Sequence, residues 1–168
     1  MKAIVFGSLL IFTQTVFAAA PYNFLDLGNA TDAVHTCRAM TTGDARLCAR
    51  VRDLDDSQLC AGWTNHSTID CRGIVNRDQQ RFCFGAAVDN VNACYQIRDR
   101  DMSRFCIAAA TNNAANCRGM LNRDYGLLCF AMLSGTVRNC DGIFDGMTRQ
   151  FCLATATGDQ RRCNSIGN

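Results

Sequence analysis

The chain has 168 residues and carries 17 basic and 15 acidic side chains, which leaves a formal net charge of +2. Lys2 is the only lysine and glutamate is absent, so arginine and aspartate supply nearly all of the charge. A chain this close to neutrality lacks the basic excess with which proteins attract nucleic acids or anionic membranes. We therefore expect no nucleic-acid partner.

Residues 1–18 are typical of a secretory signal peptide. Met1 and Lys2 form a short positive start, the residues up to Phe17 are mainly apolar, and Ala18 is a small residue suited to the cleavage site. The apolar run is short and interrupted for a membrane span, so an uncleaved anchor is the less favoured alternative. We expect export to the periplasm or the extracellular medium, with no membrane attachment after cleavage.

Residues 19–31 form a lead-in that precedes the repetitive domain, residues 32–168. Its apolar residues Phe24, Leu25 and Leu27 suit a cap on the first repeat, because a terminal repeat has no neighbour to cover its inner face.

The repetitive domain follows from the spacing of its cysteines. Successive cysteines are 11 and 12 residues apart in strict alternation, which makes a period of 23 residues that occurs six times. An even number of cysteines in an exported chain is typical of a disulfide framework. Because no pair has the C-x-x-C spacing of metal sites, we expect neither a metal ion nor a cofactor.

Aligned on this period, with Asp32 as position 1, each repeat predicts a first helix. Position 1 is aspartate in five repeats, and aspartate is favoured at the N-cap of a helix. Positions 5, 6 and 8 hold a large residue, a cysteine and a small residue in most repeats, which indicates a closely packed face. The position-1 aspartates are Asp32, Asp55, Asp78, Asp101 and Asp124, and Met147 replaces them in the sixth repeat.

A turn and a second helix are predicted from position 12 onward. Position 12 mostly tolerates the left-handed conformation that ends a helix, and position 13 holds an N-cap residue in every repeat. The second cysteine, at position 17, shares a helix face with the aliphatic residue at position 20. Position 22 is aspartate or asparagine, which suits a helix end. The predicted fold is all-α: an α-solenoid of six 23-residue helix-turn-helix repeats, each cross-linked by one disulfide.

Two disulfide pairings fit this spacing. Pairing across the 12-residue gaps leaves Cys37 and Cys163 without partners, whereas pairing across the 11-residue gaps uses every cysteine. We therefore predict one bridge within each repeat, although the spacing alone does not exclude bridges between successive repeats. The predicted pairs are Cys37–Cys48, Cys60–Cys71, Cys83–Cys94, Cys106–Cys117, Cys129–Cys140 and Cys152–Cys163.

Seven residues are candidates for a binding surface. Position 23 is arginine in three successive repeats, and in two of them another arginine follows one helical turn later. Arginine forks bind carboxylates and phosphates, but aspartates flank these arginines, so we favour ion pairs within the protein over a ligand-binding edge. Trp63 replaces smaller residues, either for packing, which we favour, or as an exposed contact. The candidates are Arg77, Arg81, Arg100, Arg104, Arg123, Trp63 and Tyr95.

Most of the patterned polar residues therefore have a predicted structural role, and no catalytic motif is found. We expect a protein-binding module rather than an enzyme: a scaffold, an adaptor or an inhibitor of the immunity type. One alternative is a structural spacer, coat or filament subunit that associates with itself. The other is a thiol–disulfide redox protein, which would need an exposed reducible bridge.

Overall fold

The computed structural model describes residues 29–168, and every regular element in this range is helical. The predicted signal peptide and residues 19–28 of the lead-in lie outside the described residues. No helix within 29–168 combines the length and the apolar composition needed to cross a membrane.

Each repeat contributes two helical segments, as predicted, but the first is a long helix and the second is a short segment. The long helices are α1 (Ala30–Thr42), α2 (Leu54–Asn65), α4 (Arg77–Ala87), α6 (Arg100–Ala110), α7 (Arg123–Ser134) and α8 (Gly146–Thr157). The short segments are η1 (Ala45–Arg50), α3 (Thr68–Cys71), α5 (Val91–Cys94), η2 (Ala114–Cys117), η3 (Val137–Gly142) and η4 (Gln160–Ser165).

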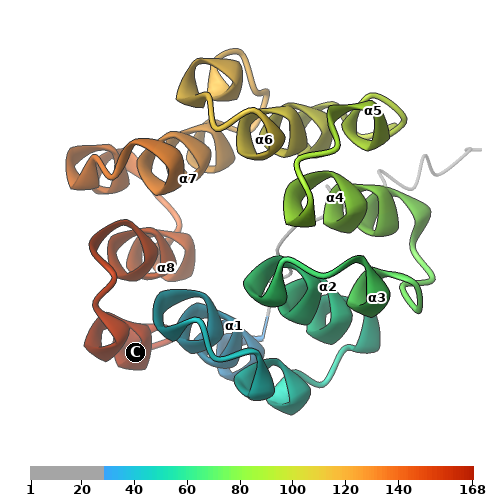
Figure 1. The fold of residues 1–168 in the computed structure, drawn as a ribbon. Helices are drawn as coiled ribbons and strands as arrows, with labels where there is room; N and C mark the ends of the chain where they lie inside the picture. Colours follow the sequence, from blue (N-terminus) through green and yellow to red (C-terminus); the bar gives the residue numbers. More distant parts are fainter. Residues whose placement is uncertain (1–28) are drawn as a thin grey trace, which may run out of the picture.

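The six repeats close into a ring. Each long helix packs against the next, and α1 packs against both α8 and η4, so the last repeat contacts the first. Figure 1 shows the long helices around the inside of the ring and the short segments around its outside. The helical repeats therefore form a closed arrangement, and within the described residues neither terminal repeat keeps an open inner face.

The disulfides follow the ring, and the predicted pairing is wrong. Five bridges join position 17 of one repeat to position 6 of the next, and the sixth joins the last repeat to the first across 126 residues. The structure contains none of the predicted within-repeat pairs, which were Cys37–Cys48, Cys60–Cys71, Cys83–Cys94, Cys106–Cys117, Cys129–Cys140 and Cys152–Cys163. The bridges are Cys37–Cys163, Cys48–Cys60, Cys71–Cys83, Cys94–Cys106, Cys117–Cys129 and Cys140–Cys152.

Ring closure is the physical reason for this correction. The within-repeat pairing was preferred because the alternative left Cys37 and Cys163 unpaired, but closure brings these two together, with Cα atoms 5.7 Å apart. Thr41 and Arg38 of α1 add contacts at the same junction, to Cys163 and to Asn164 respectively. The bridges therefore connect repeats to one another rather than the two helices of one repeat.

The small residue at position 8 makes room for each bridge. At Gly62, a Cβ atom would lie 2.5 Å from the sulfur of Cys83 and 2.8 Å from that of Cys71, which form the bridge to the following repeat. In the first repeat, Ala39 packs against Cys48 and Cys60 in the same way. Position 8 thus places a glycine or an alanine of each long helix beside the next disulfide.

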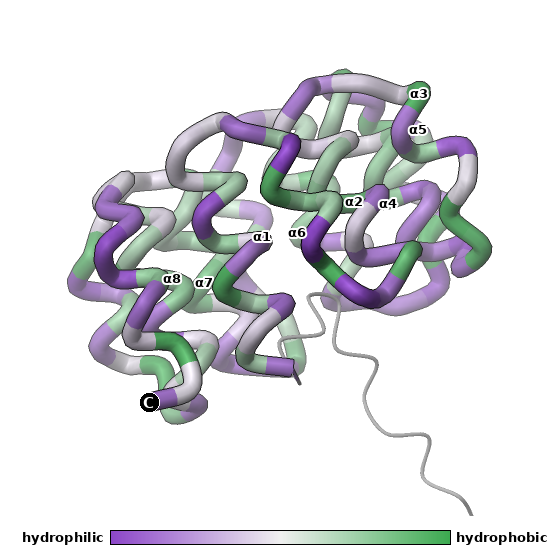
Figure 2. The backbone as a smooth tube through the Cα atoms, turned by 90° about the horizontal axis from the view of Figure 1, so that it is seen from below, coloured by the Kyte–Doolittle hydropathy of each residue, from purple (hydrophilic) through white to green (hydrophobic). Residues whose placement is uncertain are grey.

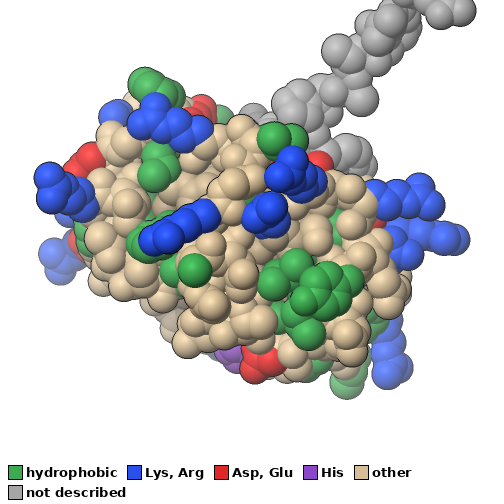
Figure 3. Space-filling model, turned by 90° about the horizontal axis from the view of Figure 1, so that it is seen from above, with side chains coloured by type: hydrophobic (Ala, Val, Ile, Leu, Met, Phe, Trp, Pro, Cys, Tyr) green, Lys and Arg blue, Asp and Glu red, His purple; other side chains and the backbone are tan. Residues whose placement is uncertain are grey.

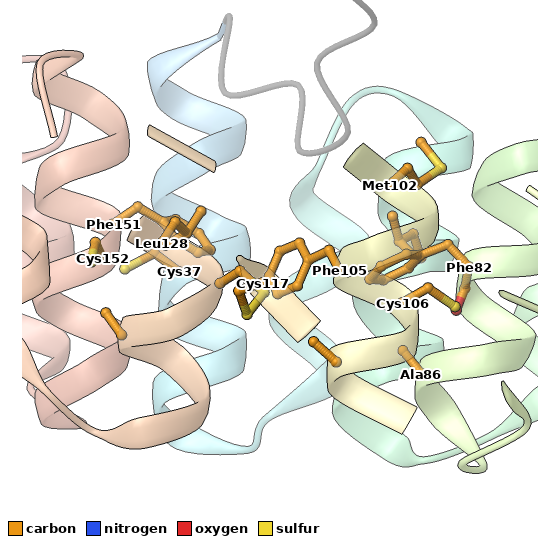
Figure 4. Packing of buried hydrophobic residues seen from close by; sticks show 14 of the residues in the cluster. Cys37, Phe82, Ala86, Met102, Phe105, Cys106, Cys117, Leu128, Phe151 and Cys152 are labelled. Atoms are coloured by element: carbon orange, nitrogen blue, oxygen red, sulfur yellow. A yellow bond between two sulfur atoms is a disulfide. The ribbon is translucent and has the colours of Figure 1, made fainter. Parts of the chain in front are cut away.

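Large apolar residues at position 5 fill the interior. Phe82, Phe105, Leu128 and Phe151 are fully buried, and Figure 4 shows them converging from different long helices. Trp63 of α2 lies 5.2 Å from the ring of Phe82 and 5.9 Å from that of Phe105, so it packs across two repeats. Figure 2 shows hydrophobic stretches within the helices and hydrophilic residues in many turns.

The turn between the two helices of each repeat is confirmed. All six position-12 residues have positive φ, including the non-glycine residues His66, Asp89 and Asn112. All six position-13 residues are N-caps of the short segments. The sequence pattern at these positions therefore predicts the local backbone correctly.

The position-1 aspartates have another role than the predicted one. The N-cap of each long helix from α2 onward is the position-22 residue that precedes it, such as Asp99 for α6. In α2, α4, α6 and α7, position 1 lies in the first turn of the helix, where the aspartate carboxylate accepts two backbone N–H groups from the loop that leads into the next long helix. Asp101, for example, accepts from Leu121 and Asn122 at 2.7 and 2.6 Å. The same contact occurs at Asp55, Asp78 and Asp124.

Candidate functional site

Two pockets on α6 and α7 form the candidate site. The α6 pocket has a volume of about 380 Å³ and lies between one face of α6 and η2. The α7 pocket has a volume of about 310 Å³ and lies between the corresponding face of α7, the end of η2 and η3. Both lie where a long helix meets the short segments. Figure 1 shows α6 and α7 at the top of the molecule, and Figure 3 views the molecule from that side.

The repeat symmetry relates the two pockets. Every residue that lines the α6 pocket has a counterpart 23 residues later that lines the α7 pocket. The pairs are Ile97 and Met120, Arg100 and Arg123, Ser103 and Gly126, Arg104 and Leu127, Ile107 and Phe130, and Asn116 and Asn139. The backbone therefore builds one kind of site twice, on neighbouring helices, with different side chains.

Polar side chains dominate the α6 pocket. Arg104 donates from Nη1 to the backbone carbonyl of Arg118 at 2.7 Å, which fixes its guanidinium at the end of η2. Ser103 donates to the carbonyl of Cys94 at 3.0 Å. Arg100 is exposed and has no ion-pair or hydrogen-bond partner in the part of the chain that the structure describes. The pocket thus combines one fixed and one free guanidinium.

Hydrophobic side chains dominate the α7 pocket. Leu127 and Phe130 take the places that Arg104 and Ile107 occupy on α6. Arg123 lies over the ring of Phe144, 5.0 Å from its centroid, so its guanidinium has an aromatic neighbour. Phe144 is 80% exposed, which extends the hydrophobic surface beyond the pocket.

The surrounding surface mixes two kinds of side chain. Figure 3 shows arginine and hydrophobic side chains interspersed on this side of the molecule, with few acidic side chains between them. Large hydrophobic side chains that are mostly exposed include Val75, Leu121 and Phe144, all at position 21 of their repeats. This combination of arginine with exposed aromatic and aliphatic groups is typical of surfaces that bind other proteins.

The other predicted site residues lie elsewhere. Arg77 is exposed at the start of α4 and lines neither pocket. Arg81 donates to the backbone carbonyl of Gln96 and lies 3.5 Å from Asp78, so the alternative of internal ion pairing applies to it. Trp63 is partly buried and packs against the core, which agrees with the packing interpretation, and Tyr95 is 67% exposed after α5 but lines neither pocket. Binding by these residues stays a prediction.

Sequence reasoning missed most of the pocket lining. Arg100, Arg104 and Arg123 were predicted, but their neutral neighbours were not. The available signal was a change of chemistry at fixed repeat positions, where Leu127 follows Arg104 and Gly126 follows Ser103 one repeat later. Such a change is informative only once the positions are known to face a cavity.

The described residues contain no candidate metal-binding cluster. Within residues 29–168, histidine, cysteine and aspartate side chains form no group of three that would hold a metal ion. No family model, no curated protein and no solved structure matches the chain.

Proposed function

We propose that this chain is an exported binding module that holds another protein on the outer face of the ring, at the α6 and α7 pockets. The observation that carries the proposal is the recurrence of one pocket at two neighbouring helices, bordered by exposed arginine and hydrophobic side chains. Repeat proteins commonly present extended surfaces of this kind to macromolecular partners. Six disulfides suit an oxidising extracellular environment.

Burial of the bridges supports binding over redox chemistry. Thiol–disulfide exchange requires a thiolate to reach a sulfur atom of the bridge. All twelve cysteines are paired, and none is more than 4% exposed. Ring closure also removes the reason for expecting self-association, because the repeat faces that would stack between molecules are covered within one molecule.

A capture experiment tests the proposal. The oxidised protein is immobilised, incubated with envelope and secreted fractions of the source organism, and the retained proteins are identified by mass spectrometry. We expect one protein to be retained in near-stoichiometric amount. Replacing Arg100 and Arg123 by alanine should lower its retention about tenfold or more, since loss of a hot-spot arginine costs about 2 kcal/mol.

The matched control uses arginines outside the pockets. Arg77 is exposed at the start of α4, at the same repeat position as Arg100 and Arg123, and Arg52 is exposed in the loop before α2. Their replacement by alanine should leave retention unchanged. An equal loss of retention in both double variants would show a general charge effect and reject the site. If only further copies of the chain are retained, the self-association alternative is favoured.

A further inference from the structure

The chemistry of the α6 pocket favours a carboxylate. None of its lining residues is acidic, and it presents the guanidinium groups of Arg100 and Arg104. The adjacent carboxylates bind backbone groups and form no ion pair with Arg100 or Arg104 within residues 29–168: Asp99 accepts the N–H of Met102 at 2.7 Å, and Asp101 accepts two N–H groups of the next loop. Since Arg104 is held by one hydrogen bond, its remaining N–H groups are oriented in advance for a ligand.

The chemistry of the α7 pocket favours an apolar side chain. At the position of Arg104 it has Leu127, and Gly126 in place of Ser103 removes a hydroxyl group. Phe130 and Met120 complete a mainly hydrophobic lining, and Leu121, 74% exposed, lies next to Met120 in the chain. Arg118, Arg123 and Asn139 also line this pocket, but most of its exposed lining is apolar, so an apolar side chain that enters it loses contact with water against an apolar surface.

The arrangement of the two pockets indicates the spacing of the ligand groups. Adjacent packed helices lie about 8–10 Å apart, and an extended chain advances about 3.3 Å per residue. We propose that the paired pockets bind an extended segment of the partner protein, with an acidic side chain in the α6 pocket and an apolar side chain about three residues away in the α7 pocket. This inference rests on the proposed protein-binding function and specifies its ligand.

Synthetic peptides test the inference directly. Fluorescein-labelled peptides carry glutamate and phenylalanine separated by two variable residues, in both orders. Matched sets replace glutamate by glutamine or phenylalanine by alanine, and fluorescence anisotropy gives each Kd. We expect one order to bind best, with a loss of about tenfold in either matched set. Arg100→Ala should remove the preference for glutamate over glutamine, while Arg77→Ala should keep it.

The chain itself supplies the sharpest variant. Exchanging Arg104→Leu and Leu127→Arg swaps two side chains that occupy the same repeat position, so each helix receives a residue that its neighbour already accommodates. The double variant should reverse the preferred order of glutamate and phenylalanine. Near-unchanged unfolding and all six disulfides in its peptide map would establish that the ring is intact.

Four outcomes would overturn the inference: equal binding of glutamate and glutamine peptides, an unchanged order preference in the intact swapped variant, no binding by any peptide, or binding instead to vesicles that contain anionic lipid. None of these decides the proposed function. If a captured partner still depends on Arg100 and Arg123, the binding module stands and its ligand is a folded surface. If capture fails as well, both proposals fall.

Discussion

At the scale of single residues, the position-1 aspartates join neighbouring repeats through backbone contacts. Asp101 is representative, since its two oxygens accept the N–H groups of Leu121 and Asn122 at the entrance to α7. The sequence pattern suggested an N-cap because aspartate occupies such positions so often. A carboxylate in the first turn can also accept N–H groups from another segment, which local propensity does not reveal.

We predict that Asp101→Asn destabilises the protein by about 1–3 kcal/mol. The amide keeps one acceptor but places a donor opposite a backbone N–H, so one of the two charge-assisted hydrogen bonds is lost and the other is weakened. Denaturant unfolding of the oxidised variant measures the change. Asp141→Asn is the control, because Asp141 is exposed on η3 and its replacement should alter stability by less than about 0.5 kcal/mol. Equal effects would contradict the role of Asp101.

His35 predicts a pH dependence of stability. Burial lowers its pKa, and the charges of Arg50 and Arg38 lower the pKa further. A histidine with a lowered pKa binds fewer protons in the folded state than in the unfolded state. Stability is therefore highest above the unfolded pKa of about 6.5 and decreases as the pH falls through that value toward the folded pKa.

The variant His35→Gln tests this dependence. His35 has the same repeat position as Gln58 and Gln150, so the fold already accommodates glutamine at this position. The unfolding free energy of the parent protein should decrease from pH 7.5 to pH 5 by more than that of the variant. Identical pH profiles would show that His35 does not contribute.

At the scale of secondary-structure elements, two helical glycines predict opposite effects of one substitution. A Cβ atom at Gly62 would lie 2.5 Å from the sulfur of Cys83, whereas at Gly126 its nearest neighbour is the carbonyl of Cys117, at 3.5 Å. Gly62→Ala should therefore destabilise by about 1–3 kcal/mol through overpacking. Gly126→Ala should stabilise by about 0.5–1 kcal/mol, because alanine favours the helix. Thermal unfolding compares them, and equal signs would contradict the argument.

The elements also show how far the sequence pattern predicts this fold. Positions 12 and 13 were predicted correctly because a left-handed residue and an N-cap depend on local backbone geometry. The disulfide pairs were not predicted correctly, because the partner of each cysteine depends on how one repeat is rotated relative to the repeat before it. That rotation arises from packing such as Phe82 against Trp63, and its sum over six repeats determines whether Cys37 meets Cys163. The pockets were missed for the same reason: whether Leu127 lines a pocket depends on how α7 packs against η3, which the sequence does not show.

At the scale of the whole molecule, the bridges and the chain between them form a closed covalent loop. Starting at Cys37, this loop follows an 11-residue segment, crosses a bridge, and repeats this around the ring until Cys163 returns to Cys37. The Cys37–Cys163 bridge thus constrains about 70 residues even when the other five are intact, whereas each of the others closes a loop of about 13. In the chain-entropy model the corresponding stabilisations are about 4 and about 3 kcal/mol.

We therefore predict that replacing Cys37 and Cys163 by serine costs about 1 kcal/mol more than replacing Cys94 and Cys106. Peptide mapping of the parent protein first identifies the Cys37–Cys163 cross-link, which the within-repeat pairing would not produce. Denaturant unfolding then compares the two double variants, and hydrogen exchange should increase chiefly in α1 and η4 of the first, because these elements meet at the opened junction. The loss of stability could instead be smaller in the variant that lacks Cys37 and Cys163. This would mean that α1 and α8 stay in contact in compact unfolded states, even without the bridge. The Cys37–Cys163 bridge would then reduce the conformational entropy of the unfolded chain by less than the length of its loop predicts.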